Sequence, residues 1–454
     1  MATPRTEPGD SPTTIPHVPP AHGTTVLEVA QRPPTNPVAR LLKILGPGLI
    51  TGASDDDPSG IGTYAVAGAA LGYGMLWTAP WCLPLMASVQ FICAKVGMVC
   101  GRGLAGVLRH HYPRWLLYPA VLLLVVANTI NAGADMGAIA AAINLLVPAL
   151  PISTLIVPIA LAILVLQVWG SYQLVARTFK WLTLALLAYV LSGLFARPDV
   201  GEVVQATIVP RLRLDTESLT TLVAILGTTI SPYLFFWQSS QEVEEEVEMG
   251  RTRLWQRVGA TDEELKYRAW DVNFGMFFAI IVMYFIMLAT GATLNKAGKT
   301  DITSAAEAAV ALQPLAGPAA GLLLALGLIG TGFLAVPILT GSAAYAVSEA
   351  FGWRFGLNQK LVRAKQFYAV IIVATLIGMA IDFMGINPIN ALFWTAVING
   401  FLAPPLLVLI LIIANNRGIM GRRVNGVGTN LLGGAASLAM FVAALILVAS
   451  WLRH

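Results

Sequence analysis

Three consecutive aspartates interrupt a long apolar run near the start of the chain. The run reads LLKILGPGLITGASDDDPSGIGTYAVAGAALG, and Asp55, Asp56 and Asp57 stand in its middle, directly before Pro58. A carboxylate at the depth of a lipid bilayer costs roughly 3 kcal/mol or more, and it is tolerated where water or a counter-charge compensates it. Because no Lys or Arg is needed inside any apolar run, we expect a bound cation to supply that counter-charge.

This run and a second one contain residues that break helices. Proline removes a backbone donor and clashes one turn back, so the carbonyl groups near Ser54 should be freed. The second run, LVAILGTTISPYLFFWQ, is interrupted at Thr228, Ser231 and Pro232. A lone proline in a membrane helix is most often only a kink, but corresponding interruptions in two halves of a chain are typical of a transporter's substrate site. Neighbours on a helix point about 100° apart, so the aspartates cannot all face one site. Asp57 is the predicted main ligand.

The composition identifies the elements that hold these residues as membrane helices. Hydrophobic residues make up 56% and charged residues 11% of the 454-residue chain, whereas soluble domains average about 45–50% and 25%. The apolar runs are continuous, which favours helices of about 20 residues over the alternating pattern of a β-barrel. We predict an all-α membrane protein with eleven spans, near residues 43–71, 73–98, 116–147, 152–170, 175–195, 218–240, 270–294, 318–350, 367–383, 387–414 and 429–451.

The distribution of basic residues predicts the orientation of these spans. Cytoplasmic loops carry the excess of Lys and Arg. With the N-terminus in the cytoplasm and the C-terminus outside, all but six of the 28 basic residues fall on the cytoplasmic side; the six are Arg197, Arg211, Arg213, Lys296, Lys299 and Arg453. We therefore expect a multi-pass protein of a bacterial-type inner or plasma membrane.

The spans also predict the organisation of the chain. Residues 1–40 are rich in Pro, Thr and charge and are expected to be a disordered cytosolic tail, without a signal peptide. Residues 41–454 form a single transmembrane domain, with 43–195 as the first repeat, 218–414 as the second, inverted repeat, and 429–451 as an extra helix. The three cysteines offer no disulfide framework.

The acidic residues outside the first run have several interpretations. Asp135 lies at mid-span, while Asp271, Glu349 and Asp382 lie nearer the ends of spans. The run QEVEEEVE, residues 241–248, is read as a solvated helix end that faces Arg251, Arg253 and Arg257, with an ion-exit funnel as the alternative.

The motifs resemble those of the Nramp family of metal-ion transporters, from GPGLITG to NNRGIMG. The family's Asp-Pro-Gly-Asn corresponds to Asp57, Pro58, Ser59 and Gly60. The resemblance implies the leucine-transporter-type fold, a 5+5 inverted repeat with broken first and sixth helices. The resemblance also gives counterparts for three other family features. The sixth-helix pattern Ala-x-x-Met-Pro-His corresponds to Thr228, Thr229, Ile230, Ser231, Pro232 and Tyr233. The third-span pattern Asp-Leu-Ala-Glu corresponds to Asp135, Met136, Gly137 and Ala138, and the tenth-helix ligand corresponds to Asn399.

The departures from the family pattern suggest a harder ion. Ser231 replaces a methionine, and a thioether favours transition metals over strongly hydrated cations. Gly60 and Ser231 also leave a larger cavity, which suits an ion that keeps part of its water shell. We expect divalent metal transport, of Mg²⁺ and/or Mn²⁺, by alternating access through an all-oxygen site formed by Asp57, Ser54, Asp56, Gly60, Thr228, Ser231 and Asn399.

Proton coupling is not favoured by the residues available. All five histidines lie outside the spans, so we expect uncoupled uptake, with Asp135 and Tyr233 on a proton or ion pathway. The expected partners are the metal ion and membrane lipid; no cofactor, nucleic acid or obligate protein partner is implied. The alternatives are a sodium- or proton-coupled symporter of a small organic substrate and a Mg-dependent membrane enzyme. The enzyme would need a second carboxylate cluster and basic groups for phosphates.

Overall fold

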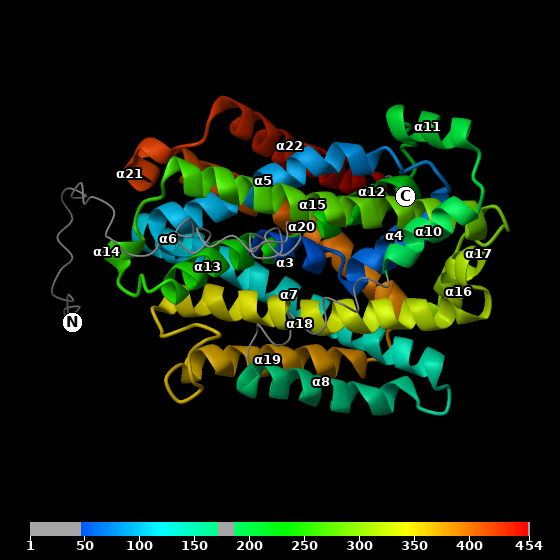
Figure 1. Ribbon diagram of the computed structural model, residues 1–454, viewed down its shortest axis with the longest axis horizontal. Helices are drawn as coiled ribbons and strands as arrows, with labels where there is room; N and C mark the ends of the chain where they lie inside the picture. Colours follow the sequence, from blue (N-terminus) through cyan, green and yellow to red (C-terminus); the bar gives the residue numbers. More distant parts are fainter. Residues whose placement is uncertain (1–46, 171–185, 453–454) are drawn as a thin grey trace, which may run out of the picture.

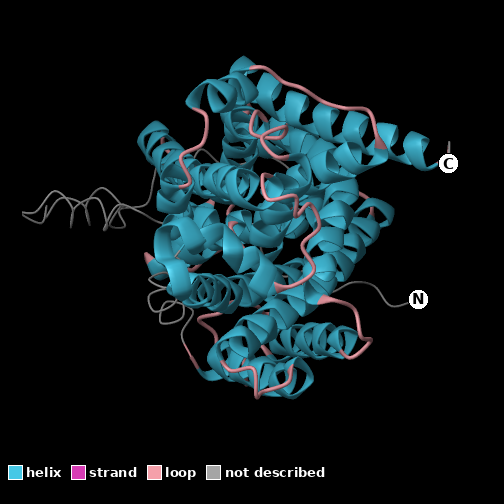
Figure 2. Ribbon diagram, turned by 90° about the vertical axis from the view of Figure 1, so that its right-hand side faces the viewer, coloured by secondary structure: helices cyan, strands magenta, loops and turns pink. Residues whose placement is uncertain are grey.

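The computed structural model describes residues 47–170 and 186–452, which form a bundle of helices without any strand in those ranges (Figures 1 and 2). The predicted disordered tail, residues 1–40, lies outside the described residues. So does most of the fifth predicted span, which is described only from its end, as α10 (Leu187–Phe195). The all-α prediction is confirmed.

Nine helical segments in the described ranges are long and apolar enough to cross a membrane. One of them combines α12 (Thr216–Thr229) with α13 (Pro232–Glu248). The others include α5 (Thr78–Cys100), α7 (Arg114–Leu146), α8 (Ile152–Trp169), α15 (Asp262–Thr290), α18 (Ala320–Phe351), α19 (Lys365–Asp382), α20 (Pro388–Asn415) and α22 (Val427–Trp451). Together with the split first span and the partly described fifth, they match the predicted set.

The first span is split as its sequence predicts. Helix α3 (Pro47–Asp55) ends at the aspartates, and α4 (Pro58–Leu71) begins at the proline, which stands at the helix start where its missing N–H is harmless. The sixth span has the same design, because α12 ends at Thr229 and α13 begins at Pro232. Figure 1 shows α3, α4 and α13 inside the bundle, between the α5/α15 side and the α18 side.

Small residues let the broken helices approach their neighbours. A Cβ atom added to Gly52 would lie 2.3 Å from the Gly275 carbonyl oxygen of α15, and one added to Gly227 would lie 2.1 Å from the Ala396 carbonyl oxygen of α20. Backbones that approach this closely through glycine are a common means of helix packing in membranes. The Gly52 contact holds α3 against α15, and the Gly227 contact holds the end of α12 against α20 at the level of the second break.

Two helix boundaries differ from the predictions. Helix α15 begins at Asp262 rather than near residue 270, because Thr261 and Glu264 form a reciprocal cap: the Thr261 hydroxyl accepts from the Glu264 N–H, and the Glu264 carboxylate accepts from the Thr261 N–H. Helix α13 continues to Glu248, so the acidic run is part of it. Short helices α6 (Leu104–His111), α11 (Val200–Ile208) and α14 (Leu254–Arg257) lie in the connections.

Candidate functional site

The Asp57 carboxylate is held at the first helix break by its own chain. Asp57 is the N-cap of α4, and its Oδ1 accepts a 2.6 Å hydrogen bond from the Gly60 N–H. An N-cap aspartate is a common structural feature, so capping alone would explain this contact. The side chain is only 1% exposed, however, which is unusual for a cap.

Two further donors bring other helices to the same carboxylate. Asp57 Oδ2 accepts from the Asn131 amide of α7 at 3.2 Å and from the Tyr233 hydroxyl of α13 at 3.4 Å. The Tyr233 hydroxyl also donates, at 2.9 Å, to the Ser54 carbonyl oxygen, whose regular helical donor would be the N–H that Pro58 lacks. Hydrogen bonds from neutral donors stabilise an ionised carboxylate. The two breaks therefore meet at Asp57, Ser54 and Tyr233.

The hydroxyl groups of the second break are used differently from the prediction. The Ser231 hydroxyl donates to the carbonyl oxygens of Gly227, at 3.0 Å, and Thr228, at 2.5 Å, so it closes the last turn of α12. The Thr229 hydroxyl instead reaches toward the first broken span, where it lies 3.0 Å from the Tyr64 hydroxyl of α4. Thr228, the neighbour of Thr229 in the chain, is also buried. None of the hydrogen bonds found among the described residues joins Thr228 to Asp57.

Helix α20 lies against both breaks. The Ser59 hydroxyl of α4 donates to the Leu392 carbonyl oxygen at 3.2 Å and lies 3.4 Å from the Thr395 hydroxyl. Asn399 lies one helical turn after Thr395 on α20 and is 3% exposed. The next residue, Gly400, packs against Gly227 of α12. This places Asn399 at the level of the second break, while the described contacts do not join it to Asp57.

The aspartate of the third span lies near the same place. Asp135 is fully buried on α7, one turn after Asn131, and Asp57 and Asp382 are its acidic neighbours. Neither of its carboxylate oxygens has a hydrogen bond of normal geometry, although the Ser59 N–H is close. Asp382 lies against α7, where a Cβ atom on Gly137 would be 2.8 Å from its Oδ1.

The buried aspartates of this region are not neutralised by basic residues. In residues 47–170 and 186–452, no ion pair involves Asp55, Asp56, Asp57 or Asp135. Nor does any group of three or more His, Cys, Asp or Glu side chains in these ranges converge on one metal position. The arrangement thus differs from a closed structural metal site. It suits an ion bound by one or two carboxylates, carbonyl oxygens and water.

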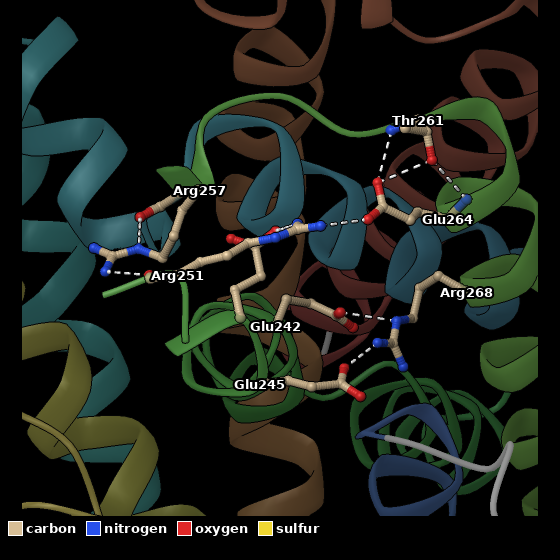
Figure 3. Close-up of polar contacts among 9 residues, drawn as sticks. Glu242, Glu245, Arg251, Arg257, Thr261, Glu264 and Arg268 are labelled. Carbon is tan, nitrogen blue, oxygen red and sulfur yellow. Dashed lines mark hydrogen bonds and ion pairs between the residues drawn. The ribbon is translucent and has the colours of Figure 1, made fainter. Parts of the chain in front are cut away.

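A second acidic region, at the end of the bundle where α13 and α15 meet, corrects the reading of residues 241–248 as a solvated helix end. Glu242 and Glu246 are 1% and 3% exposed. Figure 3 shows the buried Arg268 of α15 between Glu242, at 2.8 Å, and Glu245. Arg251 pairs with Glu246, at 3.5 Å, and with Glu264, at 2.8 Å.

The same region contains Asp271, which the sequence places near the start of the seventh span. Arg268 also pairs with Asp271 at 2.7 Å, and Asp271 accepts from the Gly48 N–H of α3 at 2.8 Å. On α3, the Thr51 hydroxyl donates to Gln238 of α13, whose amide donates to Glu242. The network joins α3, α13 and α15, so the N-terminal half of the first broken span is fixed by charge as well as by packing.

Two other charged residues inside predicted spans have structural roles. Lys95 of α5 is 7% exposed and donates to the Val424 carbonyl oxygen at 2.9 Å, so it fastens the segment just before α22 to the end of α5. Glu349 of α18 accepts from the N–H groups of Gly103 and Gly106, each at 2.9 Å, and so caps α6. Neither belongs to the aspartate region.

The comparisons with known proteins agree with this geometry. The Nramp family model, described as natural resistance-associated macrophage protein-like, matches residues 48–450. The structure of a manganese transporter from Eremococcus coleocola, in complex with an aromatic bis-isothiourea substituted compound, aligns with a TM-score of 0.70 at 18% identity, covering 91% of this chain and 87% of the other. MHP1, a nucleobase-cation-symport-1 family transporter with bromovinylhydantoin bound, aligns with a TM-score of 0.58 at 14% identity, covering 90% and 89%.

Two broken helices that meet at a buried carboxylate, inside a bundle that aligns with these structures, define the leucine-transporter-type fold. The chain belongs to the Nramp family. It is accordingly an integral membrane protein and a divalent metal transporter, and the prediction that it is not an enzyme is confirmed.

Proposed function

We propose that the chain transports Mg²⁺, and Mn²⁺ as a second substrate, through a site centred on Asp57. The observation that carries the proposal is the meeting of the Asp57 carboxylate, the Ser54 carbonyl group and the Tyr233 hydroxyl at the two breaks. Among residues 47–170 and 186–452, no ion pair involves Asp57. All three groups offer oxygen, which Mg²⁺ prefers. Alternating access would open this position to one side of the membrane at a time.

The remaining predicted ligands extend this site. Gly60 contributes the N–H that fixes Asp57, and its lack of a side chain leaves room, since an added Cβ atom would lie 3.1 Å from the Asp55 carbonyl oxygen. Thr228, Ser231 and Asn399 supply further oxygen around the second break. Asp56 stands beside Asp57, and Asp135 and Tyr233 form the proposed path to it. Mg²⁺ keeps several waters, so few protein ligands are needed.

Uncoupled import driven by the membrane potential follows from the same residues. No histidine lies within the described membrane helices, so the usual side chain that titrates near neutral pH is missing there. The distribution of Lys and Arg supports a cytoplasmic N-terminus and an external C-terminus, as in an inner or plasma membrane.

An organic-substrate symporter is the second candidate, because MHP1 shares the fold. The cluster of Asp55, Asp56 and Asp57 argues against it. An organic substrate would have to compensate several buried carboxylates, whereas a small divalent cation does so directly.

Ion uptake into proteoliposomes tests the proposal. We expect uptake of Mg²⁺ and Mn²⁺ that exceeds uptake of Ca²⁺, stimulated by an inside-negative potential, with no acidification of the lumen in step with metal entry. Lumen acidification in proportion to uptake would refute uncoupled transport. Absence of divalent uptake, with uptake of an organic solute instead, would favour the symporter.

Replacing Ser231 with methionine tests whether the second break sets the ion preference. The variant introduces a soft thioether at the position where the Ser231 hydroxyl now closes the end of α12. We expect the ratio of Mn²⁺ or Cd²⁺ uptake to Mg²⁺ uptake to rise, because thioethers favour softer metals. Ser88→Ala, on α5, is the control. An unchanged ratio would show that Ser231 does not line the ion's position.

A further inference from the structure

The buried side-chain amide of Asn131 uses only one of its two polar atoms. Asn131 lies on α7 and is 1% exposed, and its Nδ2 donates to the Asp57 Oδ2 at 3.2 Å. Its Oδ1 is buried as well, and no hydrogen-bond donor reaches this oxygen among the residues that the structure describes. A buried polar atom without a partner is unfavourable. An apolar residue would avoid that cost, so the amide calls for a function.

A second asparagine on the same helix shows a purely structural use of such an amide. Asn128 lies about one turn before Asn131 and is also buried, and its Nδ2 donates to the Leu339 carbonyl oxygen of α18 at 2.9 Å. The Asn128 amide thus joins α7 to α18, whereas the Asn131 amide points to the carboxylate at the first break.

The two oxygens of the Asp57 carboxylate are held differently. Oδ1 accepts a short hydrogen bond, at 2.6 Å, from the Gly60 N–H. Oδ2 accepts two long ones, from Asn131 at 3.2 Å and from the Tyr233 hydroxyl at 3.4 Å. Hydrogen bonds in proteins are most often about 2.9–3.0 Å long for an N–H donor and about 2.7–2.8 Å for a hydroxyl. Oδ2 is therefore the carboxylate oxygen that is available to an ion.

The Asn131 amide can offer either of its polar atoms to this position. The last side-chain torsion of asparagine is broad and about twofold, so a rotation of about 180° exchanges the places of the oxygen and the nitrogen. Asn131 Oδ1 would then lie where Nδ2 now lies, 3.2 Å from the Asp57 Oδ2. Neighbouring oxygen ligands of an octahedral Mg²⁺, with bonds of about 2.0–2.1 Å, are about 2.9 Å apart. The spacing fits two ligands of one ion.

We propose that Asn131 is a ligand of the transported ion. Its amide nitrogen donates to Asp57 while the site is empty, and its carbonyl oxygen binds the ion once the ion has entered. The inference rests on the proposed function, because it places Asn131 at the ion that Asp57 binds. An amide oxygen is a hard ligand that adds no charge to the buried aspartates. Helix α7 then contributes to the site together with the two helix breaks.

A matched pair of substitutions tests this role through equilibrium dialysis of the purified full-length chain against Mn²⁺ and against Cd²⁺. Asn131→Leu and Asn131→Met both lose the donor to Asp57 and have similar volumes, but only the second carries a thioether. We expect the dissociation constant for Mn²⁺ to rise about tenfold in both. Because thioethers favour soft ions, Asn131→Met should bind Cd²⁺ several-fold more tightly than Asn131→Leu.

Asn128→Leu is the control for these variants. It removes a buried amide from the same helix, but that amide contacts α18 and not the carboxylate at the break. Both ions should bind to this variant as they bind to the parent. Monodispersity and helicity of each variant show that it is folded.

The possible failures of the two proposals are distinguishable. Mn²⁺ binding that is lost in Asp57→Asn but parental in folded Asn131→Leu would overturn the role of Asn131 and leave the proposed function intact. Equal Cd²⁺ affinities of Asn131→Leu and Asn131→Met, both weaker than in the parent, would show that Asn131 only holds Asp57 in place, which also overturns its role as a ligand. No Mn²⁺ bound to the folded parent would overturn both proposals.

Discussion

Asp57→Asn is expected to lower uptake of both Mg²⁺ and Mn²⁺ to the background of empty liposomes, a loss of at least about tenfold. The amide keeps an oxygen for the Gly60 N–H but removes the negative charge at the meeting point of the two breaks. Each 1.4 kcal/mol of lost binding is a factor of about ten, and a hydrogen bond or contact to a charged group contributes roughly 1.5–3 kcal/mol. Uptake by proteoliposomes of equal protein content measures the effect.

The matched control for this variant is Asp215→Asn. Asp215 is also an N-cap, of α12, but it lies outside the bundle core, where its carboxylate accepts from the Ser218 N–H at 2.9 Å. This substitution should leave uptake unchanged. Transport by Asp57→Asn at the parent rate would mean that the carboxylate serves only as a cap of α4.

Arg268→Met is expected to destabilise the protein by about 3–5 kcal/mol. The substitution removes the guanidinium that pairs with Glu242, Glu245 and Asp271, and the first and last of these remain buried. Breaking a buried ion pair by removing one partner has a cost of this size because it leaves an uncompensated charge. The midpoint of thermal unfolding, followed by loss of monodisperse protein in detergent, should fall clearly below that of the parent.

Two variants make this prediction specific. Arg213→Ala breaks an exposed ion pair with Asp215 and should change stability by less than about 1 kcal/mol. Adding Glu242→Gln to Arg268→Met should recover part of the stability, since one stranded charge is removed. A midpoint of Arg268→Met equal to that of Arg213→Ala would contradict the structural role assigned to the network.

The helix breaks could be predicted from the sequence because their causes are local. Proline at residues 58 and 232 removes a helical hydrogen-bond donor, and in both places it follows short polar residues that also favour non-helical backbone. Apolar run length places the spans that lie within residues 47–170 and 186–452. The early start of α15 could not be read from apolar length, because it depends on the polar cap of Thr261 and Glu264; the Thr-x-x-Glu pattern itself was the available signal.

The neighbours of the candidate site depended on tertiary packing. Asn131 and Tyr64 were not predicted as site residues, although Asn131 stands one turn before Asp135 in an apolar span and could have been noticed on the same face. Ser231 was expected to face the ion, but its hydroxyl is taken by carbonyl groups of its own helix end. The pairing of Asp271 with Arg268 was missed because the helix was expected to begin after residue 268.

Anomalous diffraction from crystals grown with Mn²⁺ tests the central claim most directly. The account predicts a manganese peak within bonding distance of an Asp57 carboxylate oxygen and near the Ser54 carbonyl oxygen, and no such peak in Asp57→Asn crystals. A manganese peak confined to the Glu242 and Glu246 region, with the space beside Asp57 empty, would contradict it.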